Sequence, residues 1–276
     1  MHSLKTLAAA ACLACSAAAV ATPADPVLEA VVAGDWRKAD DRARDGARHP
    51  VESLAFWGLK PGMTILEVQP GGGWWTDILA PYAQRTGGRY FATGPDLEDP
   101  TLSERARENR AAMAAKFAER KDLYGEVGIV NWGSRSAPPP AGQFDFALVA
   151  RSFHGWMRNE GFVAKALGDL YTALKPGGIL AIEQHRGNPG EQDPAAKSGY
   201  VTEAYLIEQV EKAGFRLAAR SEINANPKDT KDHPFGVWTL PPALRSTAYG
   251  SDKESDASFD HSKYLAIGES DRMTLR

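Results

Sequence analysis

The sequence predicts an α/β protein built on a largely parallel β-sheet, and two observations carry this prediction. Short, mostly apolar runs of strand length recur along the chain, at 64–69, 88–93, 126–131, 144–150 and 177–184. The first run, TILEVQ, shows no clean alternation of polar and apolar residues, as is typical of a strand covered by helices on both faces. Strands that alternate with helices imply parallel pairing through right-handed crossovers.

Segments with helical patterns lie around these strands. Residues 103–121 read as a long helix with Ser103 as its N-cap, and residues 160–175 place apolar side chains at three- and four-residue spacings before Pro176 and two glycines. Further helices are expected at 50–58, 74–83 and 202–214. Residues 215–223 and 272–276 read as two more strands, so the strand-and-helix pattern extends to the end of the chain.

The chain divides into three parts. Residues 1–21 resemble a signal peptide, with a basic start, an apolar stretch of 14 residues from Leu7 to Val20, and a small-residue site that predicts cleavage near Ala21. An uncleaved anchor is the alternative, but the stretch is shorter than the roughly 20 residues that span a bilayer. Residues 22–48 are expected to form a charged, helical surface arm. Residues 49–276 form the main domain, with a long loop insertion at about 224–269 that is either functional or disordered.

Export after cleavage predicts a periplasmic or secreted protein. Both cysteines, Cys12 and Cys15, lie in the leader, so the mature chain would contain no disulfide and no cysteine nucleophile. A lipoprotein is the weaker alternative, because neither cysteine has the usual leucine three residues before it.

Charge and motifs exclude several classes of function. The net charge is −3, and becomes −4 when Lys5 is lost with the leader, which does not favour nucleic acid or an anionic membrane as partner. The mature chain has no segment that reads as a membrane-spanning helix, and the sequence does not indicate an oligomeric state. No metal is expected, since no histidine pair has the spacing of a helical metal site. The motifs of serine hydrolases and of phosphate-binding loops are also missing.

The segment ILEVQPGGGWW, residues 65–75, marks the expected ligand site. Ligands of open parallel sheets bind at the carboxyl ends of the strands, and this turn follows the first strand. Glycines there let backbone N–H groups approach a ligand closely, and the start of the following helix adds its positive end. The run Gly71–Gly72–Gly73 exceeds what a plain turn needs, so close approach by a ligand is the better interpretation.

These residues resemble a known family, the class I S-adenosylmethionine-dependent methyltransferases. ILEVQPGGG matches the family's nucleotide-binding turn, with Glu67 as its acid, Gly71 and Gly73 as its later glycines and Gln69 in place of the first glycine. LKPGGIL, 174–180, resembles the entry to the fifth strand, and FDFALVARSFHGW, 144–156, the fourth strand and active-site loop. The resemblance implies a Rossmann-like, seven-stranded, mostly parallel sheet with an antiparallel last strand, helices on both faces, and S-adenosylmethionine as cofactor.

PGGGWWT, RSFHGW and NPKDTKDHPFGVW together look like a narrower group of exported, poorly characterised predicted methyltransferases. One position departs from the family pattern. Gly94 stands at the end of the second strand, where the family has an acid that holds the ribose, and Asp96 is a candidate substitute.

The cofactor-binding residues that the resemblance implies are Glu67, Gln69, Gly71, Gly72, Gly73, Trp74, Asp96, Trp132 and Arg151. Glu67 would order the turn or bind the ligand's amino group, with a salt-bridged strand end as the alternative. Trp74 and Trp132 could stack on the adenine or simply belong to the core. Arg151 or Arg186 could bind a carboxylate of substrate or cofactor, or neutralise nearby acids.

The catalytic candidates are His154, after the fourth strand, and His185, after the fifth. His154 would act as a general base, with a structural histidine as the alternative. The leading hypothesis is therefore an exported methyltransferase that acts on a small or lipid-like acceptor. The other hypothesis is a periplasmic binding or scaffold protein that keeps the fold without catalysis. A lid over the pocket, formed by the 224–269 segment around Asn226, Asp229 and Asp232, is weighed against a solvated loop.

Overall fold

The sheet is the centre of the protein. The computed structural model describes residues 25–248, 250, 251, 253, 254 and 256–276. Its strands are β1 (Thr64–Val68), β2 (Arg89–Gly94), β3 (Val127–Asn131), β4 (Phe144–Ala150), β5 (Leu174–His185), β6 (Arg220–Ser221) and β7 (Arg272–Leu275), in the order β3-β2-β1-β4-β5-β7-β6. β7 pairs antiparallel with both of its neighbours, whereas β1 to β5 pair in parallel. The predicted Rossmann-like, seven-stranded sheet with an antiparallel last strand is confirmed.

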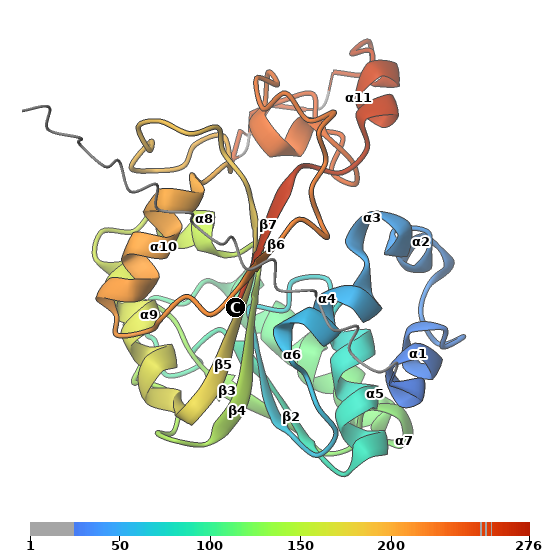
Figure 1. Ribbon diagram of the computed structural model, residues 1–276, viewed down its shortest axis with the longest axis vertical. Coiled ribbons are helices and arrows are strands. Elements are labelled where there is room, and N and C mark those ends of the chain that lie inside the picture. The colour runs from blue at the N-terminus through green and yellow to red at the C-terminus, as the bar shows by residue number, and fades with distance from the viewer. Residues whose placement is uncertain (1–24, 249, 252, 255) are drawn as a thin grey trace, which may run out of the picture.

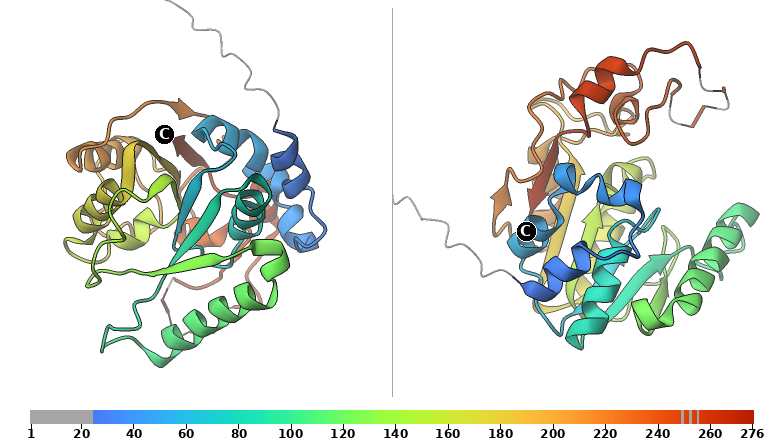
Figure 2. Two further views of the ribbon diagram at one scale, coloured as in Figure 1. Left: turned by 90° about the horizontal axis from the view of Figure 1, so that it is seen from below. Right: turned by 90° about the vertical axis from the view of Figure 1, so that its right-hand side faces the viewer.

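Helices cover both faces of this sheet (Figures 1 and 2). Helices α1, α4, α5, α6 and α7 contribute to the core on one face, and α8, α9 and α10 lie on the other. Their bounds are α1 (Pro26–Val32), α2 (Ala39–Arg42), α3 (Asp45–Arg48), α4 (Pro50–Trp57), α5 (Thr76–Thr86), α6 (Glu104–Glu119), α7 (Lys121–Tyr124), α8 (Phe153–Trp156), α9 (Phe162–Ala173) and α10 (Glu203–Lys212). Ser103 caps α6, since its hydroxyl accepts a hydrogen bond from the backbone N–H of Ala106.

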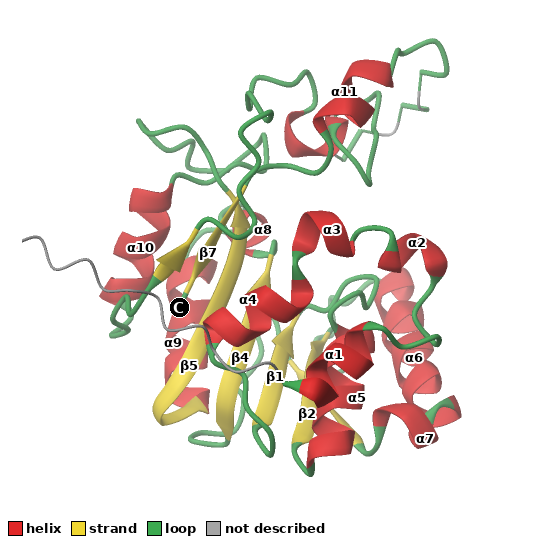
Figure 3. Cartoon of the chain, turned by 45° about the vertical axis from the view of Figure 1, so that its right-hand side comes forward, coloured by secondary structure: helices red, strands yellow, loops and turns green. Residues whose placement is uncertain are grey.

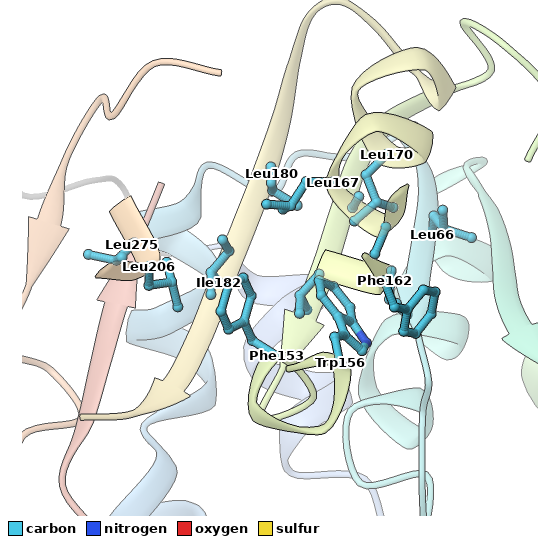
Figure 4. Close-up of a cluster of buried hydrophobic side chains, with 14 of the residues drawn as sticks. Leu66, Phe153, Trp156, Phe162, Leu167, Leu170, Leu180, Ile182, Leu206 and Leu275 are labelled. Atoms are coloured by element: carbon cyan, nitrogen blue, oxygen red, sulfur yellow. The ribbon is translucent and has the colours of Figure 1, made fainter. Parts of the chain in front are cut away.

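Each face of the sheet has its own apolar core because successive side chains of a strand point to opposite faces. In β1, Leu66 packs with the core under α9, while Ile65 packs with the core under α1 and α5. Figure 4 shows the first of these cores, where Phe153 and Trp156 of α8 lie against strand β5 and helix α9. The two cores hold β1 and β4 in the middle of the sheet, so the turns that follow these strands have a rigid base.

The N-terminal segment differs from the expected surface arm. Leu28 and Val31 of α1 are buried in the core shared with α5. The Tyr82 hydroxyl donates a hydrogen bond to the Asp25 carboxylate at 2.5 Å, and the indole of Trp36 donates to the Asp77 carbonyl. The segment is therefore packed against the domain through Leu28, Val31 and these hydrogen bonds.

Two strands differ in length from their predictions. β5 begins at Leu174, before Pro176, because Leu174 already pairs with Phe144 ahead of a register shift in β4. The expected strand 215–223 is reduced to Arg220–Ser221. Its partner β7 ends at Leu275, and before Arg220 the pairing continues only as backbone hydrogen bonds of Ala218 and Ala219 with Arg276 in the described residues.

The described residues of the segment 224–269 are mostly irregular, but the base of the segment is packed on the domain. It contains a 3₁₀ turn, η1 (Gly236–Thr239), and a short helix, α11 (Ser262–Ile267), and it stands above the end of the sheet where β5 stops (Figure 3). Asn224 binds Ser53 and Thr274 through its amide nitrogen, and the Asp229 carboxylate accepts hydrogen bonds from Tyr200 and the backbone of Asp271. These buried contacts join the base of the insertion to the sheet.

The leader lies outside the described residues, and with it the predicted cleavage site near Ala21 and both cysteines. Within the described part of the chain, the helices are all too short or too polar to cross a bilayer.

Candidate functional site

Two cavities meet at the turn that follows β1. One, of about 410 Å³, opens toward β4 and β5, and we call it the β4-side cavity. The other, of about 680 Å³, opens toward β2 and β3 and is called the β2-side cavity. Both are lined by Gln69, Pro70, Gly71 and Gly72. The glycine turn therefore forms the boundary between two adjoining spaces, at the carboxyl ends of the central strands.

The backbone of this turn is bare on its cavity side. Gly71 and Gly73 have φ angles of 57° and 85°, which favour glycine. A Cβ placed on Gly72 would meet no atom within 4 Å, and one on Gly71 only its own turn's Gln69 carbonyl at 4.0 Å. Side chains do not fill the space above these two glycines, as close approach by a ligand requires.

Gln69 and Glu67 hold the turn from below. The backbone N–H of Gln69 donates to the Thr93 hydroxyl, and its side-chain oxygen accepts from the Trp156 indole at 2.8 Å. Glu67 accepts hydrogen bonds from Thr76 at 2.8 Å and from Tyr90 at 2.5 Å. The bond to Thr76 links the end of β1 to the first turn of α5, which fixes the path of the glycines.

Burial decides the charge of Glu67. Its side chain is almost completely enclosed, and this desolvation raises the pKa of Glu67 to about 7, although the Tyr90 and Thr76 hydroxyls favour the ionised form. Glu67 also lines the β4-side cavity. It is therefore a carboxyl group that exchanges its proton near neutral pH beside the predicted ligand.

The β2-side cavity has an aromatic and polar lining. Trp132 lies in its wall, and its indole N–H donates to Asp169 at 2.9 Å, which fixes the plane of the ring. Asn109 and Lys116 line it from α6. The sequence predicted that Trp132 could stack on the adenine of the cofactor, and its ring lies in the wall of this cavity.

Gly94 also lines this cavity, and the structure explains why no acid stands there. A Cβ at this position would lie 2.7 Å from Cδ of Arg110 and 3.0 Å from Cε of Met113. The space that a ribose-binding acid would need is thus taken by two side chains of α6. The backbone of Gly94 remains in the wall of the cavity.

Two of the predicted cofactor-binding residues are engaged in other contacts. Asp96 lines neither cavity, and its carboxylate accepts a hydrogen bond from the backbone N–H of Glu98, so it closes its own turn. The Trp74 ring lies in the β4-side cavity but is packed against the guanidinium groups of Arg37 and Arg48, 5.2 and 4.8 Å from its centroid. Asp96 does not replace the missing acid, and Trp74 anchors the N-terminal helices instead of offering an open ring.

The β4-side cavity brings together His154, His185 and Arg151, as the sequence predicted for the loops after β4 and β5. The two histidine rings lie 5.5 Å apart, and Trp238 of the insertion stacks edge-on 5.7 Å from His154. Nδ1 of His185 pairs with the Ser270 hydroxyl at 2.6 Å. Burial, with His154 and Arg151 as neighbours, lowers the pKa of His185 well below its usual value.

The proton position on His154 follows from its partner Gln184. The side-chain nitrogen of Gln184 is oriented by the Gly199 carbonyl, to which it donates at 3.1 Å, and the same nitrogen lies 3.2 Å from Nδ1 of His154. An amide nitrogen only donates, so Nδ1 must accept and the ring proton lies on Nε2. Burial and the nearby Arg158 lower the pKa of His154 to about 4. At neutral pH the ring is therefore uncharged and carries an N–H donor on Nε2 in the lining of the cavity. This differs from the predicted general base, which would need a nitrogen free to accept a proton from the substrate.

Sequence reasoning missed several residues of this cavity. Arg44 and Arg48, near the end of the N-terminal helices, and Glu269, near the C-terminus, line it. The Glu269 carboxylate binds Nε of Arg44 at 2.8 Å and Nε of Arg48 at 2.9 Å. More than 220 positions separate these partners along the chain, so no local pattern could have joined them.

The insertion contributes to the lining of the cavity, but through other residues than those weighed for the lid. Residues 237, 238 and 240–243 line it, whereas Asp229 is engaged with Tyr200 and His233. Arg186 binds Glu222 and Asp271, so it neutralises acids outside the cavity. Within the described residues, no group of three histidine, cysteine, aspartate or glutamate side chains is arranged to hold a metal ion.

The fold and the glycine turn define a class of protein, the class I S-adenosylmethionine-dependent methyltransferase fold. A methyltransferase of this kind from Aquifex aeolicus superposes with a TM-score of 0.50 at 23% identity, covering 67% of this chain and 89% of that one. The 1,6-didemethyltoxoflavin-N1-methyltransferase of Burkholderia thailandensis, solved with S-adenosylhomocysteine, gives 0.46 at 15% identity, covering 87% and 78%.

A curated relative points to the same family. The ubiquinone/menaquinone biosynthesis C-methyltransferase UbiE of Rhizobium johnstonii is 29% identical over 123 residues, which are 45% of this chain and 42% of that protein. The match therefore spans less than half of the relative's length. No protein-family model matches the chain. The comparisons support the class I methyltransferase family as the group to which this fold is related.

Proposed function

We propose that this protein is an exported S-adenosylmethionine-dependent methyltransferase acting on a small or lipid-like acceptor. The observation that carries the proposal is the bare glycine turn between two adjoining cavities. One cavity can hold an adenosyl group beside Trp132, and the other can hold the sulfonium end together with an acceptor. The similarity to UbiE over 123 residues supports the same activity.

The residues of the site fit most of this cofactor. No side chain fills the space beside Gly71 and Gly72, so the cofactor could approach their backbone, and Trp132 offers an aromatic wall for the adenine. The ribose hydroxyls would meet no carboxylate at Gly94, and Asn109 is a neutral polar side chain that lines the cavity from α6 beside Lys116. A neutral amide in place of a carboxylate forms weaker hydrogen bonds, so we expect modest affinity.

The chain contributes mainly by alignment. S-adenosylmethionine supplies an already activated methyl group, so the protein has to place an acceptor in line with it. Holding two reactants at contact distance can contribute about 7 to 11 kcal/mol to the lowering of the barrier. The insertion residues 237, 238 and 240–243 line the β4-side cavity and would shield the acceptor from water on that side.

Export is the second part of the proposal. It rests on the leader-like residues 1–21 and on a mature chain without cysteine. Fractionation of the producing cell, followed by N-terminal sequencing, tests it. A mature chain that begins near Thr22 in the periplasm or medium supports export, and an intact Met1 in the cytoplasm contradicts it.

A binding or scaffold role without catalysis is the second candidate, and Gly94 is the observation that favours it. Arg110 and Met113 occupy the place of the ribose-binding acid. Calorimetric titration of the mature protein with S-adenosylhomocysteine separates the two candidates. Saturable binding that Gly72→Val weakens supports the methyltransferase, whereas no heat even at high ligand concentration supports the second candidate.

A further inference from the structure

The β4-side cavity contains a cationic group without a partner. The guanidinium of Arg151 makes no hydrogen bond and no ion pair within the described part of the chain, and its Nε is buried. Its backbone N–H donates to the Glu183 carbonyl at 2.6 Å and its φ is 55°, so the residue is held in a left-handed conformation at the end of β4. Arg151 is partly buried, and its Nε is shielded from water without a partner, which is costly unless a ligand supplies the missing anion.

The surrounding charges do not supply that anion. The carboxylates nearest to these arginines are already bound: Glu269 is shared by Arg44, Arg48 and Arg272, and Glu183 binds Arg272. Both amino nitrogens of Arg48 are also buried without partners. Arg44, Arg48, Arg151 and Arg272 thus stand against the carboxylates of Asp41, Glu183 and Glu269, while Glu67 in the same cavity is uncharged below a pKa of about 7.

His154, which also lines this cavity, favours an anionic ligand as well. Nε2 of His154 carries the ring proton, because Nδ1 accepts from Gln184. No described residue accepts from this Nε2–H. An oxyanion would accept hydrogen bonds from it and from Arg151 together, whereas a neutral hydroxyl acceptor would find no base at this nitrogen.

Part of the cavity lining is apolar. Val237, Leu240 and the Pro241–Pro242 pair form this part, with Trp238 beside His154. A ligand with an anionic head and an apolar body would place its head at Arg151 and its body under these residues.

From these observations we propose that the methyl acceptor is a small carboxylic acid with an apolar body, bound as its carboxylate by Arg151 and His154. This inference rests on the proposed methyltransferase function and adds the acceptor class. A carboxylate oxygen would form a bond to the methyl carbon while the carbon–sulfur bond breaks and its electron pair stays on sulfur. The products are a neutral methyl ester and a neutral thioether. No proton is released, so the reaction needs no general base.

The test measures binding of octanoate and of its neutral isostere octanamide to the mature protein saturated with S-adenosylhomocysteine. We expect octanoate to bind about ten- to a hundredfold more tightly, because hydrogen bonds to charged groups are worth that much. Arg151→Gln should abolish the preference and leave octanamide unaffected. Arg135→Gln is the matched control, since Arg135 lies outside both cavities with its side chain 65% exposed. With S-adenosylmethionine, mass spectrometry should detect methyl octanoate.

The anion could instead be the carboxylate of the cofactor, and the experiment separates these sources. 5′-Methylthioadenosine lacks that carboxylate. If Arg151→Gln weakens S-adenosylhomocysteine but not 5′-methylthioadenosine, Arg151 holds the cofactor and the inference is overturned. Equal octanoate binding by the wild type and the variant overturns it as well. If Arg151→Gln does not fold, Arg151→Lys should retain the preference for octanoate in reduced form. Octanoate binding without any binding of S-adenosylhomocysteine would refute the proposed function but keep the anion site.

Discussion

Replacing Glu67 by glutamine is expected to change how the stability of the protein depends on pH. Glu67 is buried and accepts hydrogen bonds from Thr76 and Tyr90, and burial raises its pKa from 4.5 to about 7. Glutamine has nearly the same shape and retains an oxygen that accepts both bonds, but it does not ionise. The variant therefore isolates the cost of a negative charge at this position.

The sign follows from proton binding in the two states. Between pH 4.5 and about 7 the folded protein keeps the Glu67 proton, while the unfolded chain has released it. The free energy of unfolding of the wild type therefore falls as the pH rises through this window. A shift from 4.5 to about 7 corresponds to about 3 kcal/mol at about 1.4 kcal/mol for each pH unit. The Glu67→Gln variant does not lose stability in this way. Its free energy of unfolding should therefore rise by about 3 kcal/mol relative to that of the wild type between about pH 4 and about pH 8.5.

Urea denaturation at a series of pH values measures both proteins. The difference between them removes the contributions of His154 and His185, whose lowered pKa values act in the opposite direction in both proteins. Glu126→Gln serves as the control, because the Glu126 side chain is 83% exposed and its environment changes little on folding. A wild-type-minus-variant difference that stays constant across this range would refute the assignment of a buried, protonated Glu67.

The remaining predictions concern the site. Gly72→Val should weaken S-adenosylhomocysteine about tenfold or more in calorimetry and shift Tm by only about 2 °C, because its Cβ meets no atom within 4 Å; an unchanged affinity would remove the turn from the site. Nitrogen NMR of the His154 ring should show a neutral ring with its proton on Nε2 from pH 8 down to about pH 5, since its pKa is lowered to about 4, and a midpoint near 6.5 would contradict this. Trypsin cleavage within 224–269 should slow when S-adenosylhomocysteine and octanoate are bound, because residues 237, 238 and 240–243 line the cavity; equal rates with and without them would exclude a lid.

Much of the fold was predictable because its signals are local. The strands β1 to β4 and the helices α6, α9 and α10 lie within a few residues of their expected bounds, since their apolar residues are continuous or recur with helical spacing. β6 was predicted too long. A strand persists only where another strand pairs with it, and the length of β7 cannot be read from residues 215–223.

The site was predictable only in part. Gly71, His154, His185 and Arg151 follow strands whose ends meet at one edge of the sheet, so the topology brings them together. Asp96 was chosen by its distance along the chain from Gly94, but it turns away to bind the backbone of Glu98. A side chain's direction after a strand depends on the turn that follows, which the sequence specifies weakly.

The residues alone determined the alternation of strands and helices, the bare turn after the first strand and the place of the histidines, since each of these depends on neighbours in the chain. The tertiary structure decided which charged side chains lie together and where ionisable side chains such as His154 carry their protons. Arg48 meets Glu269 across most of the chain, and Gln184 sets the proton of His154. Protonation and pairing depend on burial and on distances in space, and these exist only once the chain has folded.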